Sequence, residues 1–316
     1  MVTFQMQQPL NLNFEMKKII LLMTILLMFQ KVFPQNENEV CPLLQKAAKS
    51  YCDGNYKTSV KTLNEFLRLY PSHLLNQEAM YARGLCAYLS GKEKLAYRYL
   101  EEVMSLKSYQ ESDSFGYSIL LCNYIQNNCK NILVPDYLQN LQHEASILLY
   151  ELEMKNKNYA KAYVHLDNAA RYYRFWYGCG TTDLEESMRL ALLFSAYYDK
   201  INQPDTAVYE LFPFLFEPSA FPGKYYENVC KTAADKLIKL KGEAEVKSEL
   251  AKAVRDVYYE SHEDLHGHEA RIWYVRFFGF KIKASPEYLH SKVNSPDEVQ
   301  QYLMQTTFYK LIFNLP

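Results

Sequence analysis

The chain has 316 residues, with 35 Lys and Arg against 36 Asp and Glu, so its formal net charge of −1 does not steer it towards nucleic acid or anionic lipid. Only 10 residues are glycine, well below the average of about 7 per cent, which disfavours glycine-rich phosphate loops and β-barrels. The sequence holds no P-loop, dinucleotide fingerprint or nucleophile elbow. We therefore expect no cofactor and no nucleic-acid partner.

The N-terminal residues predict an export signal. Lys17 and Lys18 precede an apolar run, Ile19–Phe29, as in the basic and apolar regions of a secretory signal peptide. This run is too short to span a membrane comfortably. Translation is expected to begin at Met16, and residues 1–35 are assigned to an N-terminal extension and signal peptide. We expect a periplasmic or secreted protein, or one whose uncleaved signal segment is its membrane contact.

Export would place the seven cysteines of the chain in an oxidising compartment, so they are candidates for disulfide bonds. Their odd number leaves at least one free or paired between chains. Cys52 and Cys86 lie near the ends of first helices in consecutive predicted helix pairs and form one candidate bond. Cys122 and Cys129 form another. The alternative is that most are small, buried apolar residues.

A pair of amphipathic helices is predicted from Leu43 to Pro71, joined by a turn at Gly54 and Tyr56. Apolar residues recur at the spacing of one helical face in each half, and Pro71 follows where the second helix must stop. The apolar residues of the two faces are Leu43, Leu44, Ala47 and Tyr51, and then Val60, Leu63 and Leu67.

The same pattern returns in the next segment, with its turn at Gly91. The two turn glycines are 37 residues apart, close to the period of about 34 residues of a helix–turn–helix repeat. The residues of this copy are Met80, Tyr81, Gly84, Tyr88, Gly91, Ala96, Leu100, Val103 and Met104.

These two copies resemble the tetratricopeptide repeat family. In that family, small residues at the positions of Ala47 and Gly84 let neighbouring helices approach closely. The resemblance implies an all-α solenoid of stacked helix pairs, whose concave groove binds a protein or peptide partner without catalysis. The residues that carry the repeat signature are Ala47, Gly54, Tyr56, Pro71, Gly84, Gly91, Ala96, Tyr159, Ala162 and Ala207.

Later copies match the pattern less completely, and the repeat region is assigned to residues 36–260. The third copy has Lys157 and Asn158 at its bend, and comprises Tyr150, Tyr159, Ala162, Tyr163, Leu166 and Ala169. The fourth comprises Ser195, Tyr198, Ala207, Val208, Leu211 and Phe214, with Pro204 and Pro218 after its helices. A fifth pair is expected at 225–241 and 244–260, with Gly242 between, and an out-of-register helix at Phe115–Ile125.

An aromatic run after the third copy supplies candidate partner-binding residues. Tyr172, Tyr173, Phe175 and Trp176 are residue types that commonly anchor protein interfaces. The alternative is that this run is the end of a repeat helix that packs on its neighbour.

The sequence from His262 to His266 satisfies the H-E-x-x-H pattern of zinc metallopeptidases. On a helix, both histidines would reach one zinc ion, Glu263 would be the general base, and Glu287 is a candidate third ligand. Gly267 directly after the motif, and the helical repeats in place of an upstream sheet, weaken this interpretation. A zinc-dependent hydrolase is therefore the alternative, and our expectation is no catalysis and no metal.

The C-terminal segment, residues 261–316, is predicted to cap the open end of the stack. Any strand is expected within 270–284, because aromatic and β-branched residues gather there. The chain is expected to be almost entirely helical from about Val40 to Tyr259. Ser295–Glu298 has the residues of a capping box with proline at the first helical position, which predicts a last short helix.

Overall fold

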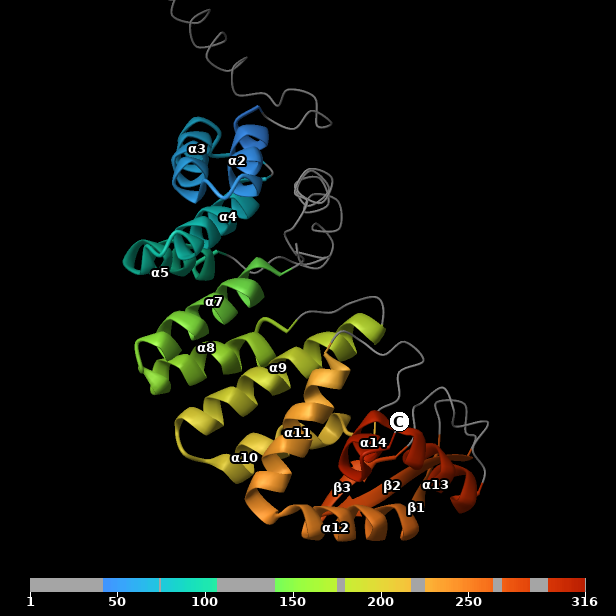
Figure 1. Ribbon diagram of the computed structural model, residues 1–316. Coiled ribbons are helices and arrows are strands. Elements are labelled where there is room, and N and C mark those ends of the chain that lie inside the picture. Colours follow the sequence, from blue (N-terminus) through green and yellow to red (C-terminus); the bar gives the residue numbers. More distant parts are fainter. Residues whose placement is uncertain are drawn as a thin grey trace, which may run out of the picture. The chain divides into compact units, whose positions relative to one another are not determined.

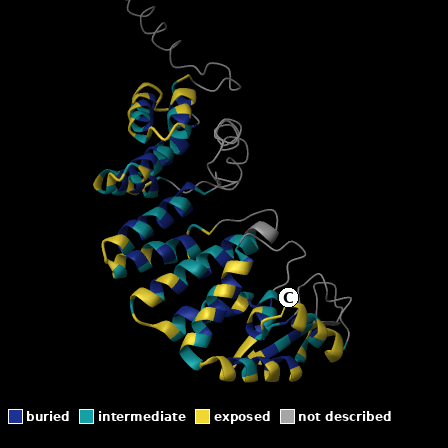
Figure 2. Cartoon of the chain, in the orientation of Figure 1, coloured by how far each residue is buried: buried dark blue, intermediate teal, exposed yellow. Residues whose placement is uncertain are grey.

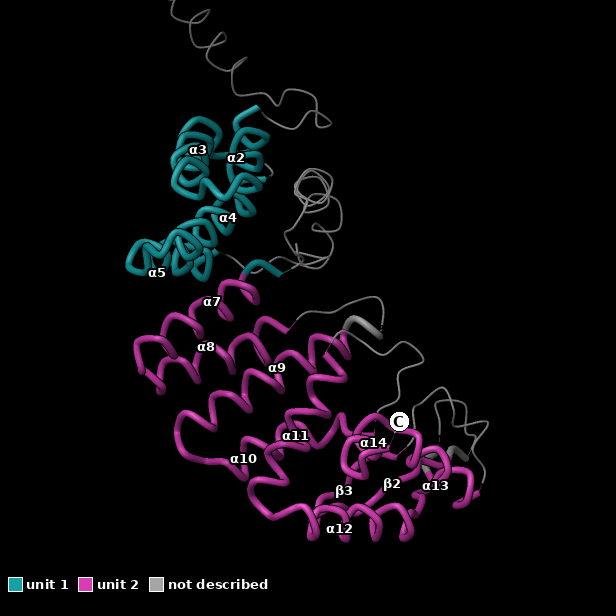
Figure 3. The backbone as a smooth tube through the Cα atoms, in the orientation of Figure 1, with its two compact units in different colours: residues 1–141 teal, residues 142–316 magenta. Residues whose placement is uncertain are grey.

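The computed structural model describes residues 42–73, 75–106, 140–174, 180–216, 225–263, 269–284 and 295–315. The chain divides into two compact units, Met1–Leu141 and Gln142–Pro316 (Figure 3). The described part is mainly helical, with consecutive helices in contact and one small antiparallel sheet (Figure 1). The predicted signal segment, the helix at Phe115–Ile125 and the pair Cys122 and Cys129 lie outside the described residues.

In the described part of the first unit, each helix contacts the next one along the chain. Three of these helices have a buried and an exposed side, as the predicted apolar faces require, whereas the helix Asn76–Leu89 is exposed only at its last residue (Figure 2). Asn55 begins the second helix by accepting the amide of Thr58 through its side chain at 3.2 Å. The helices are α2 (Pro42–Cys52), α3 (Tyr56–Leu69), α4 (Asn76–Leu89) and α5 (Glu93–Met104).

Both predicted turn glycines have the left-handed backbone that the turn needs, with φ of +70° at Gly54 and +72° at Gly91. After α2, the amide of Gly54 donates to the carbonyl of Tyr51 at 3.0 Å, and that of Asn55 to Ser50 at 2.8 Å. The turn between α4 and α5 has the same two bonds. This is the Schellman ending of a helix, in which two otherwise unpaired carbonyls gain donors.

Gly84 of α4 packs closely against Leu100 of α5. A Cβ atom added to it would lie 2.8 Å from Cδ2 of Leu100 and 3.1 Å from its Cγ. The predicted role of this position in close helix packing is confirmed. Two buried hydrogen bonds connect α4, α3 and α2. The Cys86 thiol of α4 donates to Ser59 Oγ of α3 at 3.3 Å, and Ser59 Oγ donates to the Ala47 carbonyl of α2 at 3.0 Å.

The Cys52–Cys86 disulfide prediction is wrong. Cys86 carries a free thiol buried between helices, and burial raises its pKa to about 11. Cys52 is disulfide-bonded. The hydrogen bond from Cys86 to Ser59 shows that this thiol serves as a small, buried group in the helix contact.

The second unit continues with helix pairs and ends in a mixed helix and strand segment. The fourth predicted pair has a short second helix, because α10 starts at Pro204 and a 3₁₀ turn follows. The helices are α7 (Leu141–Lys155), α8 (Tyr159–Arg171), α9 (Gly180–Lys200), α10 (Pro204–Tyr209), η1 (Phe212–Phe214), α11 (Tyr226–Lys241), α12 (Glu243–Arg255), α13 (Pro296–Gln305) and α14 (Thr307–Phe313).

The Schellman ending recurs twice in this unit without glycine. Lys157 after α7 has a φ of 59° and Asn202 after α9 has a φ of 57°. The amide of Asn158 donates to the Glu153 carbonyl at 2.8 Å, and the amide of Gln203 donates to that of Tyr198 at 2.9 Å. The predicted bend at Lys157 and Asn158 is therefore confirmed, with the same hydrogen bonds as the two glycine turns. Gly242 joins α11 directly to α12, also as expected.

The C-terminal segment is not all-α. It holds a sheet in the order β1-β2-β3, formed by β1 (Tyr258–Glu263), β2 (Glu269–Phe277) and β3 (Phe280–Lys283). Both pairings are antiparallel, with Tyr258 opposite Tyr274 and Tyr274 opposite Lys283. The predictions of helix up to Tyr259, and of strand only within 270–284, are therefore wrong for β1. Helix α12 ends at Arg255, which leaves the following residues to pair with β2.

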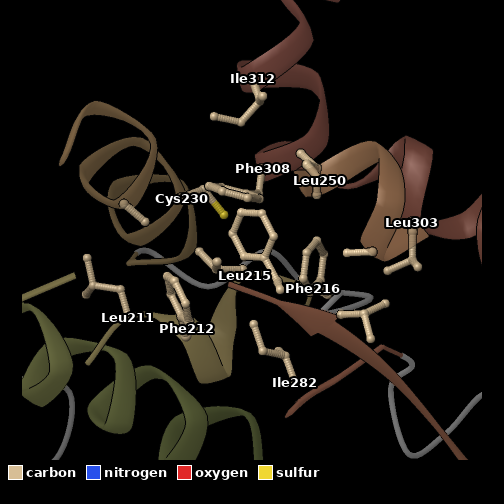
Figure 4. Packing of buried hydrophobic residues seen from close by; sticks show 14 of the residues in the cluster. Leu211, Phe212, Leu215, Phe216, Cys230, Leu250, Ile282, Leu303, Phe308 and Ile312 are labelled. Carbon is tan, nitrogen blue, oxygen red and sulfur yellow. The ribbon is translucent and has the colours of Figure 1, made fainter. Parts of the chain in front are cut away.

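Alternate residues of β2 build the main core of this unit. Trp273, Val275 and Phe277 are buried on the inner face of the sheet, together with Ile282 from β3. Helices α12 and α14 pack against this core (Figure 4), and Phe308 of α14 contacts the Phe277 ring at a centroid distance of 5.9 Å. The aromatic contacts join residues that are far apart in the sequence.

The predicted capping box before α13 is confirmed. The amide of Ser295 donates to Glu298 Oε2 at 3.1 Å, and the amide of Glu298 donates to Ser295 Oγ at 3.4 Å. The last helix, α14, was not predicted, and it contacts α11 and α12. None of the helices in the described part of the chain has the length and apolar content to cross a bilayer.

Replacement of Gly84 by leucine should destabilise the first unit by roughly 1–3 kcal/mol, because the new side chain would overlap Leu100. Urea unfolding measures this change. Lys61→Leu, on an exposed site of α3, is the matched control and should change the unfolding free energy by less than about 0.5 kcal/mol. Equal effects of the two variants would contradict the close approach of α4 and α5.

Replacement of Lys157 by glycine should stabilise the protein by about 0.5–1 kcal/mol. A left-handed backbone costs a non-glycine residue about 1–2 kcal/mol, which exceeds the entropy that glycine adds to the unfolded chain. The same change at Lys155, the last residue of α7, should instead destabilise by up to about 1 kcal/mol. Thermal unfolding of both variants tests whether the signs differ.

Candidate functional site

The C-terminal end of α8 presents the first part of the predicted aromatic anchor. Tyr172 is 78% exposed, and Tyr173 is half-buried. The amides of both tyrosines donate to the carbonyl of Asn168, at 3.0 and 2.9 Å. Phe175 and Trp176, the other two predicted anchors, lie outside the described residues. The structure thus places one large aromatic side chain in solvent, on a backbone that is hydrogen-bonded to the helix.

A buried histidine of α7 fixes this backbone. The His143 Nδ1 atom lies 3.0 Å from the Ala169 carbonyl oxygen and 3.1 Å from that of Tyr173. Both are acceptors, so Nδ1 carries a proton and donates. The other ring nitrogen, Nε2, lies 2.8 Å from Glu186 Oε1. With the carboxylate ionised, both nitrogens donate, and the ring is a positively charged imidazolium.

The charges around His143 alternate in sign. Arg189 Nη1 donates to Glu186 Oε2 at 3.2 Å, and both terminal nitrogens of Arg189 donate to the Glu144 carboxylate at 3.2 Å. Two cations and two anions from α7 and α9 are therefore held together. A partly buried cluster of this kind is stable only when every member has its partner, and breaking one link is costly.

Opposing effects determine the pKa of His143. Burial lowers it, but the hydrogen bond and the charge of Glu186, with the charge of Glu144, outweigh burial and raise the pKa above 6.5. The imidazolium also lies at the end of α8, where unpaired carbonyls favour a cation. The arrangement holds the segment of Tyr172 and Tyr173 in one conformation.

Sequence reasoning missed His143, Glu186 and Arg189. The separation of Glu186 from Arg189 matches an ion pair on one helical turn, which was an available signal. His143 gave none, because its partners lie on α8 and α9, distant in the sequence. Arg174 adds a further link between α8 and α9, since its Nη2 lies 3.1 Å from Asp183 Oδ2.

The H-E-x-x-H motif does not start on a helix. His262 and Glu263 belong to strand β1, where they are opposite Ala270 and Glu269. The i, i+4 spacing assumed for a zinc site requires a helix, so it does not apply to the first two residues of the motif. His266 and Glu287 lie outside the described residues. Within the described ranges, no cluster of His, Cys, Asp and Glu side chains could hold a metal ion.

The stabilising effect of His143 should depend on pH. Its pKa in the folded protein is raised above 6.5, so its stabilisation is complete below that pH and is lost as pH rises through the folded-state value. His143→Asn should therefore cost roughly 1–3 kcal/mol at about pH 5 and less at about pH 8. Urea unfolding of both proteins at each pH measures the difference.

Glu186→Gln is the companion variant for this experiment. It removes the carboxylate that raises the pKa of His143, and should shift the loss of stability to lower pH. A destabilisation by His143→Asn that grows with rising pH would show that His143 is buried as the neutral ring.

Comparisons with protein-family models, curated protein sequences and solved structures find nothing that matches this chain. What the structure itself shows is a mainly helical protein of paired helices, with a small antiparallel sheet near its C-terminus.

Proposed function

We propose that this chain is an exported, tetratricopeptide-like scaffold that binds a protein or peptide partner and performs no catalysis. The recurrence of one turn supports the repeat assignment. The residues before the second helix of four pairs, Asn55, Lys92, Asn158 and Gln203, all have ψ between 61° and 66°. Four residues further on stands a small, buried side chain in each case: Ser59, Ala96, Ala162 and Ala207.

This constant spacing has a physical reason in a helix-pair repeat. A small residue one turn into the second helix lets that helix lie close to the first, and each pair then leaves an apolar face for the next pair to cover. Scaffolds of this kind bind partners through surfaces and need no catalytic group. The fold alone does not identify the partner.

Two further features support export. The basic and apolar N-terminal residues have the pattern of a secretory signal. The disulfide of Cys52 is the second, because disulfides persist in oxidising compartments such as the periplasm and the extracellular space. We therefore propose a periplasmic or secreted location.

The exposed Tyr172 is the observation that carries the partner-binding proposal. A tyrosine that is 78% exposed offers a large contact area, with few rotatable bonds to be ordered on binding. The Tyr172 amide is hydrogen-bonded to the Asn168 carbonyl and His143 bonds the carbonyl of the next residue, Tyr173, so little further ordering of this backbone is needed. This combination of an exposed aromatic side chain and a fixed backbone is typical of an interface anchor.

A photo-cross-linking amino acid at position 172 tests this proposal in cells of the organism that makes the protein. We expect one discrete adduct with another protein. The same amino acid at Tyr70, a less exposed tyrosine of the first unit, is the control and should not give that adduct. Equal labelling from both positions would indicate random collisions and contradict the proposed site.

Tyr172→Ala should abolish binding of the partner identified by that adduct, while the unfolding free energy changes by less than about 0.5 kcal/mol, because the side chain is mostly in solvent. Calorimetric titration and urea unfolding provide the two measurements. Stoichiometric zinc in protein purified without a histidine tag, with loss of stability in chelator, would instead favour the hydrolase alternative.

A further inference from the structure

The hairpin between β2 and β3 turns in an unusual way. Phe277 is opposite Phe280, so Phe278 and Gly279 alone form the turn, with φ of 46° and 83°. Two successive left-handed residues are typical of the tight turn that favours Asn-Gly. Phenylalanine in the first position is an outlier, because a bulky side chain is strained there. Its ring is half-buried and lies at a centroid distance of 4.8 Å from Phe277.

Two cations lie opposite each other directly behind this turn. Arg276 is the registered partner of Lys281, and like charges in such positions destabilise a strand pair. Lys281 is oriented towards β1, where its Nζ pairs with Glu260 and lies 4.0 Å from the centroid of the Tyr274 ring. One of the two cations is thereby neutralised.

Arg276 remains exposed, and among the described residues its guanidinium has no carboxylate partner. Its Cζ atom lies 5.6 Å from the centroid of the Tyr258 ring. Tyr258 and Tyr274 are opposite each other, with ring centroids 6.0 Å apart. The hydroxyl of Tyr258 is buried and has no hydrogen-bond partner in the described part of the chain.

We propose that this surface binds an acidic, Glu- or Asp-rich segment of a protein partner. The hairpin surface comprises Tyr258, Tyr274, Arg276, Phe278 and Lys281. The Arg276 guanidinium takes a carboxylate through two parallel hydrogen bonds, and the neighbouring rings supply apolar contact. The proposal rests on the proposed function, since the partner is a protein, and adds a second contact to that of Tyr172.

Binding of an acidic segment accounts for two locally unfavourable features, the opposed cations Arg276 and Lys281 and the strained backbone of Phe278. Glu260 already neutralises Lys281, and an arriving carboxylate would give Arg276 the corresponding partner, so that both cations of this strand pair are balanced. Phe278 provides an aromatic contact at the turn that Asn, the less strained residue, would not provide. Departures from local preference of this kind concentrate at functional positions.

The test measures binding of fluorescently labelled poly-glutamate to the full chain by anisotropy. We expect saturable binding that weakens as salt is added. Arg276→Gln should weaken binding roughly ten-fold or more, because it removes a charge-assisted hydrogen-bonded pair. Phe278→Asn should also weaken binding, because it removes one of the aromatic rings of the hairpin surface.

Arg98→Gln is the matched control. Arg98 is also exposed, and its Cζ atom lies 5.0 Å from the centroid of the Tyr99 ring, but it belongs to α5 of the first unit. Its replacement should leave poly-glutamate binding unchanged. Absent binding, or an equal loss in the Arg98 and Arg276 variants, would overturn the proposal. Tighter binding of a single-stranded oligonucleotide than of poly-glutamate would also overturn it.

The Tyr172 adduct separates this proposal from the proposed function. If the adduct forms but poly-glutamate does not bind, the hairpin proposal alone is wrong. If poly-glutamate binds through Arg276 but no adduct forms at position 172, the hairpin surface stands, and the α8 site is wrong.

Discussion

Burial of apolar side chains between consecutive helices is the interaction on which both units depend. A helix with one apolar face is stable only when a neighbour covers that face, and small residues such as Gly84 and Ala162 allow the necessary approach. In the second unit, the rings of Phe216, Phe277 and Phe308 extend this packing from helices to the sheet. Tyr172 and the hairpin surface, which carry the candidate binding residues, belong to elements that are held in place by this packing.

Polar groups fix local conformations that apolar packing alone leaves undetermined. Conformational freedom at the end of α8 is restricted by His143, whose two nitrogens are both hydrogen-bonded. Buried ion clusters add little net stability compared with apolar packing, but they accept few alternative geometries. On the sheet, by contrast, Arg276 has been left without a carboxylate in the described part of the chain. One set of charges thus orders the protein, and the other is where we propose that a partner binds.

The sequence predicted those features that depend on neighbours in the chain. The turns at Gly54, Gly91 and Lys157 and the capping box at Ser295 depend on local backbone requirements, and all four are confirmed. Strand β1 was missed because a strand is stabilised by its partner, which lies beyond a chain reversal. The His143 cluster was missed for the same reason, since three separate helices contribute to it. Features set by neighbouring residues could therefore be predicted from the sequence, whereas contacts between distant residues became visible only in the structure.

The pattern of helix contacts also predicts where the protein opens first. Among the described residues, the main helix contacts of α2 are with α3, whereas α11 in the second unit contacts α9, α10, α12 and α14. Local unfolding free energies should therefore be low at α2 and high at α11, and amide hydrogens should exchange in that order. The disulfide at Cys52, the last residue of α2, opposes this fraying by restricting the opened chain. In a reducing environment, α2 would be the first of the described helices to be exposed to proteases.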